Sequence, residues 1–123
     1  MAKRVLDVGN CVPDHTAIRT MLETSFGAEV VQVHGPEDTF EELRKSKYDL
    51  VVINRKLDRD YSDGMDILKA IKADEQLSST PVMIITNFPE YEEAAVAAGA
   101  EPGFGKKSLY AEETQARLAK YLK

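Results

Sequence analysis

The chain has 123 residues and a formal net charge of −5, from 16 Lys and Arg against 21 Asp and Glu. This length suits a single domain over residues 1–123, and the acidic balance argues against nucleic-acid binding because phosphate backbones attract clustered basic side chains. One cysteine, Cys11, excludes an internal disulfide and a cysteine-rich zinc site. No apolar run reaches the roughly 20 residues that cross a bilayer, and no segment has a signal-peptide pattern, so we expect a cytoplasmic protein without membrane contact.

Short runs rich in Val, Ile and Leu alternate with stretches of helical periodicity along the whole chain, five of each. The third run is almost uninterrupted Leu, Val and Ile, which is typical of a central parallel strand covered on both faces. The fifth is weak, because Pro102, Gly103 and Gly105 lower its β propensity. In chain order, the expected strands are Arg4–Val8, Glu29–Val33, Asp49–Ile53, Pro81–Thr86 and Glu101–Gly105.

Helix boundaries can also be predicted from local signals. Either Ser62 or Asp63 is expected to cap the third helix. Asn87 with Glu90 has the spacing of a capping box before an Ala-rich fourth helix, and the fifth helix is expected from about Ser108. Five strands alternating with five helices predict one doubly wound α/β domain with helices on both faces of a parallel sheet.

The site of such a fold lies beyond the carboxyl ends of its strands, near the switch between the first and third strands. Residues that end these strands are therefore the candidates for function. They are Gly9, Asn10 and Cys11 after the first strand, Asn54, Arg55 and Lys56 after the third, Thr86 and Asn87 after the fourth, and Lys106 and Lys107 after the fifth.

Several short motifs occur along the chain in a characteristic order. They are Arg4-Val5-Leu6, Pro13-Asp14-His15, Tyr48–Ile53, Asp63-Gly64, Pro81–Thr86, Ala98-Gly99-Ala100 and Lys106. Together they resemble the response-regulator receiver domain, the CheY-like phosphoacceptor module of two-component phosphorelay signalling, over the full length of the chain. The resemblance implies a flavodoxin-like, three-layer (βα)5 fold with a parallel sheet in the order 2-1-3-4-5.

The resemblance also implies a chemistry built on three kinds of group. An aspartate that ends the third strand attacks phosphorus, an acidic pair after the first strand helps to hold Mg²⁺, and a hydroxyl and a lysine contact the phosphoryl oxygens. Thr86 and Lys106 match the hydroxyl and the lysine. Asn54 stands where the family has its phosphoacceptor aspartate, and a neutral amide is not a nucleophile.

The acidic pair falls on Gly9 and Asn10, or on Asn10 and Cys11 if the longer loop before Pro13 shifts the alignment by one residue. Neither pair is acidic, so we expect Mg²⁺ binding to be lost and no cofactor to be needed. With Asn54 at the phosphoacceptor position as well, the sequence predicts a degenerate pseudo-receiver. Such a module is not an enzyme, has no catalytic residue and is not phosphorylated at the usual site.

Acidic side chains near this pocket leave one alternative open. Lys106 needs a partner or solvent because an unpaired buried charge is costly, and Asp7 and Asp58 are its expected acidic neighbours, with a Lys106 pair slightly favoured for Asp7. The alternative function is a phosphoacceptor response regulator that uses the displaced acid Asp58, with Asp7 or Asp14 helping to bind a metal.

Basic side chains at the same strand ends suggest another alternative. A small anion or ligand could be bound by Lys106, Thr86 and Asn54, with Lys56 and Arg55 nearby. A solvated basic rim is the simpler interpretation of these charges.

By analogy with receiver domains, we expect output through protein contacts on the face formed by the fourth helix, the fifth strand and the fifth helix. The protein is expected to be a monomer or a weak homodimer. The candidates for exposed contacts on the interaction face are Tyr91, Glu92, Phe104 and Tyr110.

Cys11 and His15 lie four residues apart, but nothing else in the chain indicates a thiol–imidazole site.

Overall fold

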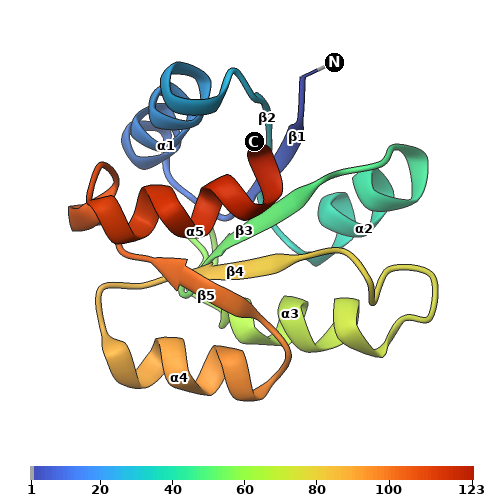
Figure 1. Ribbon diagram of the computed structural model, residues 1–123. Helices are drawn as coiled ribbons and strands as arrows, with labels where there is room; N and C mark the ends of the chain where they lie inside the picture. Colours follow the sequence, from blue (N-terminus) through green and yellow to red (C-terminus); the bar gives the residue numbers. More distant parts are fainter. Residues whose placement is uncertain (1) are drawn as a thin grey trace.

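The computed structural model describes residues 2–123. Five parallel strands form one sheet in the order β2-β1-β3-β4-β5, with helices on both faces (Figure 1). The strands are β1 (Arg4–Val8), β2 (Glu29–Val33), β3 (Leu50–Asn54), β4 (Val82–Ile85) and β5 (Glu101–Phe104). The helices are α1 (Val12–Phe26), α2 (Pro36–Lys45), α3 (Gly64–Ala73), α4 (Pro89–Ala97), the 3-10 turn η1 (Lys106–Ser108) and α5 (Glu112–Leu122). The predicted flavodoxin-like fold and strand order are confirmed.

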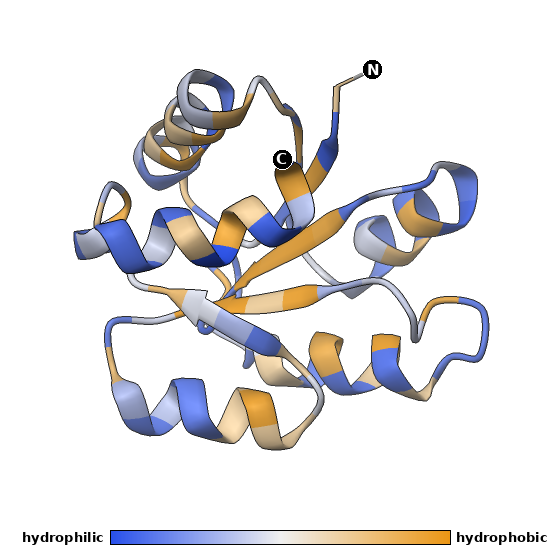
Figure 2. Cartoon of the chain, in the orientation of Figure 1, coloured by the Kyte–Doolittle hydropathy of each residue, from blue (hydrophilic) through white to orange (hydrophobic). Residues whose placement is uncertain are grey.

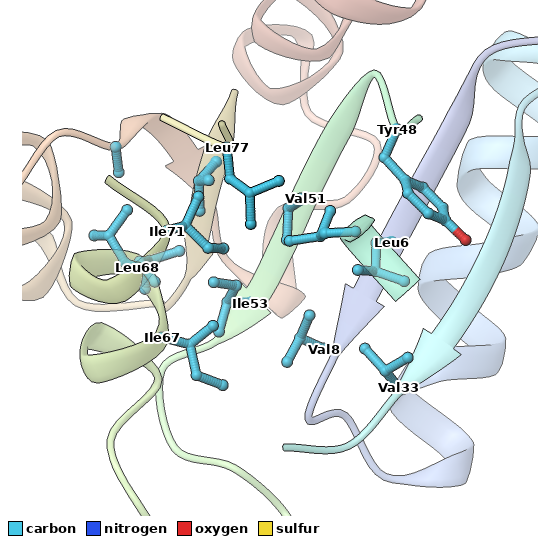
Figure 3. Close-up of a cluster of buried hydrophobic side chains, with 14 of the residues drawn as sticks. Leu6, Val8, Val33, Tyr48, Val51, Ile53, Ile67, Leu68, Ile71 and Leu77 are labelled. Carbon is cyan, nitrogen blue, oxygen red and sulfur yellow. The ribbon is translucent and has the colours of Figure 1, made fainter. Parts of the chain in front are cut away.

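The sheet separates two layers of buried apolar side chains. Figure 2 shows β3 and β4 in the colours of hydrophobic residues, as expected for strands covered on both faces. One layer lies under α1 and α5 and includes Val5, Val52, Ile18 and Leu118. The opposite layer, under α2, α3 and α4, includes Leu6, Val8, Ile53, Ile67 and Leu68 (Figure 3). Because successive side chains of a strand point to opposite faces, Asp7 shares the face of Val5 and points toward α1.

The helix boundaries agree only in part with the local signals. Asp63 caps α3 as predicted, because its carboxylate accepts a hydrogen bond of 2.9 Å from a backbone N–H two residues later. The capping box predicted at Asn87 is wrong, since the Asn87 side-chain oxygen instead accepts from the backbone N–H of Lys107 at 3.2 Å. The turn η1 delays α5 to Glu112, four residues after the predicted Ser108. Within residues 2–123, no helix combines the length and apolar composition of a membrane span.

Candidate functional site

A pocket of about 250 Å³ lies at the carboxyl ends of β3 and β4 and beside the turn that follows β5. It brings together six residues that the sequence placed at the strand ends, namely Asn54, Arg55, Lys56, Thr86, Asn87 and Lys106. Three of the lining side chains are cationic and none is a carboxylate. The full lining consists of Asn54, Arg55, Lys56, Ile85, Thr86, Asn87, Phe88 and Lys106.

Gly9 connects the end of β1 to the neighbouring strand. Its carbonyl oxygen accepts hydrogen bonds of 3.0 Å from the Asn54 side-chain amide and from the backbone N–H of Asp58. The backbone at Gly9 has a φ of +77°, and a Cβ atom here would collide with the Leu57 side chain. Backbone conformation and packing therefore favour glycine at position 9, one of the positions on which the acidic pair was expected to fall.

Asp7 is fully buried on the α1 side of the sheet rather than in this pocket. One carboxylate oxygen lies 2.6 Å from Nδ1 of His15, and the other accepts a hydrogen bond of 2.5 Å from the Asn10 amide. Burial raises the pKa of Asp7, and the contacts with His15 and Asn10 oppose this effect. The expectation that Asp7 pairs with Lys106 is wrong, because both Asp7 carboxylate oxygens are occupied by other side chains and the Lys106 ammonium pairs with Asp14.

Lys106 instead forms a 2.8 Å ion pair with Asp14 in the first turn of α1. The hydrogen bond from Lys106 holds the pKa of Asp14 below its usual range. The expectation that Asp58 is a partner of Lys106 is therefore also wrong. The pair between Lys106 and Asp14 forms because α1 and α5 cover the same face of the sheet. The Cys11 thiol donates to Asp14 at 3.3 Å, so Cys11 and His15 have different partners and form no thiol–imidazole pair.

Aromatic side chains surround the basic part of the pocket. The Arg55 guanidinium lies over the Tyr91 ring, 3.6 Å from its centroid, and the Lys56 ammonium lies 5.5 Å from the centroid of Tyr61. Phe88 packs edge-to-face on Tyr91 with ring centroids 5.9 Å apart. Sequence reasoning missed this cluster, because Tyr61 lies in a distant loop and only Phe88 and Tyr91, at the start of α4, are close in the chain.

Of the four residues expected to be exposed on the proposed interaction face, two are exposed. Tyr110 and Tyr91 are 62% and 37% exposed. Glu92 is half-buried and forms an ion pair with Arg117, which joins α4 to α5. Phe104 was wrongly expected to be exposed: it is only 4% accessible, because it pairs with β4 and packs in the layer under α1 and α5.

A doubly wound sheet with a polar pocket at the carboxyl ends of its central strands defines a flavodoxin-like domain. Residues 11–118 match the family model of the response regulator receiver domain. The chain therefore belongs to the receiver-domain family of two-component signalling. No curated protein sequence matches the chain.

Solved receiver structures are similar to this chain in fold, at low sequence identity. The signal receiver domain of a DNA-binding response regulator from Colwellia psychrerythraea aligns with a TM-score of 0.80 and 21% identity, covering 96% of each chain. The chemotaxis response regulator CheY4 of Vibrio cholerae aligns with a TM-score of 0.71 and 20% identity, covering 98% of this chain and 95% of CheY4. The receiver domain of a sensor histidine kinase from Pseudomonas aeruginosa, solved with magnesium in its active-site cleft, aligns with a TM-score of 0.72 and 21% identity. The alignment covers 99% of this chain and 95% of that receiver domain.

Proposed function

We propose that this domain is a pseudo-receiver, a non-enzymatic module that acts through protein contacts and accepts no phosphoryl group at position 54. The observation that carries the proposal is the Asn54 side chain, whose Nδ2 donates a 3.0 Å hydrogen bond to the Gly9 carbonyl oxygen. An amide is neutral and cannot attack phosphorus as a carboxylate does. An aspartate in the same conformation would place negative charge against that carbonyl oxygen, so the local packing also favours the amide.

We also propose that the domain binds no Mg²⁺ at this site. Mg²⁺ takes hard oxygen ligands and is usually held by at least one carboxylate. The ends of β1 and β3 carry Gly9, Asn10 and Asn54, which are uncharged. Of the nearby aspartates, Asp7 is bonded to an imidazole and Asp14 to a lysine ammonium. In the described part of the chain, no three His, Cys, Asp or Glu side chains group as metal ligands, so these residues do not fit the ion.

Partner binding is proposed for the face formed by α4, β5 and α5. Tyr91 and Tyr110 provide exposed aromatic surface there, and aromatic residues are enriched in protein interfaces. Arg117 of α5 fixes this face, because its guanidinium donates to Glu92 of α4 at 2.5 Å and to the Gly103 carbonyl oxygen of β5 at 2.7 Å. A face whose elements are held together in this way is suited to docking without a phosphorylation step.

The test is intact-mass spectrometry after incubation with acetyl phosphate and MgCl₂. The wild-type chain should gain no phosphoryl adduct. The matched variant Asn54→Asp restores the carboxylate alone and should still react poorly, because Gly9 and Asn10 supply no metal ligand. A phosphoryl adduct on the wild-type chain would overturn the proposal.

One observation favours a second candidate, a phosphoacceptor that uses Asp58. Its Oδ1 atom is buried and has no hydrogen-bond partner within residues 2–123, while its backbone N–H is bonded to Gly9. A buried carboxylate oxygen without a donor is unusual, and a role in phosphoryl transfer would account for it once a movement of the loop exposes the atom. An adduct that forms on the wild-type chain and is absent from Asp58→Asn would support this candidate.

A further inference from the structure

We propose that the pocket at the ends of β3 and β4 binds an acidic segment of a protein partner, with a carboxylate of that partner against Arg55. The pocket lining contains Arg55, Lys56 and Lys106 and no carboxylate, although the chain as a whole has a net charge of −5. Complementary charge directs an acidic partner to a basic pocket on an otherwise acidic protein. The inference rests on the proposed function, because a phosphorylated or metal-loaded pocket would not hold a carboxylate in this position.

Arg55 is the side chain best prepared for such a ligand. Within residues 2–123, Arg55 and Lys56 form no salt bridge, whereas Lys106 is paired with Asp14. Stacking on Tyr91 uses the face of the Arg55 guanidinium and leaves its in-plane N–H groups for acceptors.

The Nε atom of Arg55 provides independent support for a missing acceptor. It is buried and has no hydrogen-bond partner in the described part of the chain. A buried donor without an acceptor destabilises the structure, and a carboxylate is the acceptor that a guanidinium binds most strongly. A partner carboxylate would satisfy this donor and neutralise the charge at once.

The rim of the pocket favours a protein segment over a free ion. Phe88 and Tyr61 are 57% and 72% exposed, and both lie beside the cations of the pocket. An inorganic anion makes no use of aromatic surface, whereas an apolar side chain next to an acidic residue in a peptide would pack on it. A polyanionic nucleic acid is disfavoured, because it needs a row of cations and this chain is acidic overall.

The experiment selects peptides from a phage-displayed library of random dodecapeptides on the full wild-type chain, with counter-selection on Arg55→Gln. The enriched peptides should contain Asp or Glu next to an aromatic or large aliphatic residue. A fluorescent copy of the enriched peptide should bind Arg55→Gln at least about tenfold more weakly than wild type, measured by anisotropy. Phe88→Ala should weaken binding several-fold without changing its salt dependence.

The matched control is Lys47→Gln, which removes one exposed cation at the amino-terminal end of the strands and should leave peptide affinity unchanged. Circular dichroism confirms that each variant is folded. The proposal is overturned if no peptide is enriched, if the enriched peptides lack acidic residues, or if Arg55→Gln binds them as well as wild type. It is also overturned if inorganic phosphate or a single-stranded oligonucleotide binds the pocket as tightly as the peptide.

These outcomes are separate from those of the phosphorylation test. A phosphoryl adduct on the wild-type chain contradicts the pseudo-receiver proposal, whatever the peptides do. Failure of peptide binding without an adduct contradicts only the inference about the acidic partner.

Discussion

Removing the imidazole of His15 tests how the sheet accommodates the fully buried carboxylate of Asp7. In His15→Ala, this carboxylate keeps the Asn10 hydrogen bond and the more distant charge of Lys106 but loses its direct contact with the imidazole. The fold must then either keep an uncompensated buried charge or protonate Asp7. Leaving a buried carboxylate charged and without its partner costs about 3–5 kcal/mol. Protonating a carboxyl group with an ordinary pKa of 3.8 costs about 4 kcal/mol at pH 7 and less than about 2 kcal/mol at pH 5.

We therefore expect His15→Ala to lose about 3–4 kcal/mol of unfolding free energy at pH 7 and clearly less at pH 5. The sign follows from the raised pKa of Asp7: a neutral carboxyl stabilises the fold at low pH, and this stability is lost as the pH rises. Urea unfolding followed by circular dichroism measures the difference, which corresponds to a decrease in Tm of roughly 10 °C or more.

Two variants control this experiment. His34→Ala removes a half-buried imidazole whose Nδ1 has no hydrogen-bond partner within residues 2–123, since only the backbone N–H of His34 donates to Asp38, and it should cost about 1 kcal/mol with no comparable pH dependence. Asp7→Asn combined with His15→Ala should recover part of the loss, because an amide needs no counter-charge. A loss below about 1 kcal/mol in His15→Ala, or a loss equal at both pH values, would refute the reasoning.

Three further variants test other parts of the structure. In Gly64→Ala, the added Cβ atom would collide with the carbonyl oxygen of Asn54, so the free energy of unfolding should fall by about 1–3 kcal/mol. Urea unfolding measures this change, and an unchanged midpoint would contradict the close packing at Gly64. Burial raises the pKa of Tyr48 to about 12, so the neutral phenol stabilises the fold up to pH 10 and this contribution is lost toward pH 12. The free energy of unfolding of Tyr48→Phe should therefore fall less than that of wild type between about pH 9 and pH 11.5. An equal fall in both proteins would argue against a raised pKa for Tyr48. Lys106 lowers the pKa of Asp14, so their ion pair stabilises the fold above the ordinary pKa of an aspartate and this stabilisation is lost on acidification. Lys106→Met should therefore move the midpoint of acid unfolding to higher pH. An unmoved midpoint would show that the pair contributes nothing to stability.

Much of the fold could be predicted because its signals are local. Uninterrupted Leu, Val and Ile over Leu50–Ile53 indicate a strand buried on both faces, and the alternation of strands and helices indicates the doubly wound sheet. Helix starts were less predictable. Asn87 has the right spacing for a cap, yet its side-chain oxygen accepts from Lys107, which is twenty residues away. A capping signal near the end of a strand competes with such long-range partners.

The residues of the candidate pocket were also found from the sequence, since Asn54, Thr86 and Lys106 each follow a predicted strand. Their identity already predicts that a nucleophilic carboxylate is missing. The partners of the charged groups could not be found in this way. Asp14 meets Lys106 across 92 positions of the chain, and Arg55 meets Tyr91 of helix α4.

The sequence by itself determined the strands, the alternation that gives a doubly wound sheet, and the uncharged residues at the ends of β1 and β3. Only the tertiary structure decided that Asp7 faces His15 and that Lys106 pairs with Asp14. The physical reason is that alternation along a strand shows only which residues share a face of the sheet. Which helix covers that face, and therefore which side chain becomes the partner of a buried charge, depends on packing between distant segments of the chain.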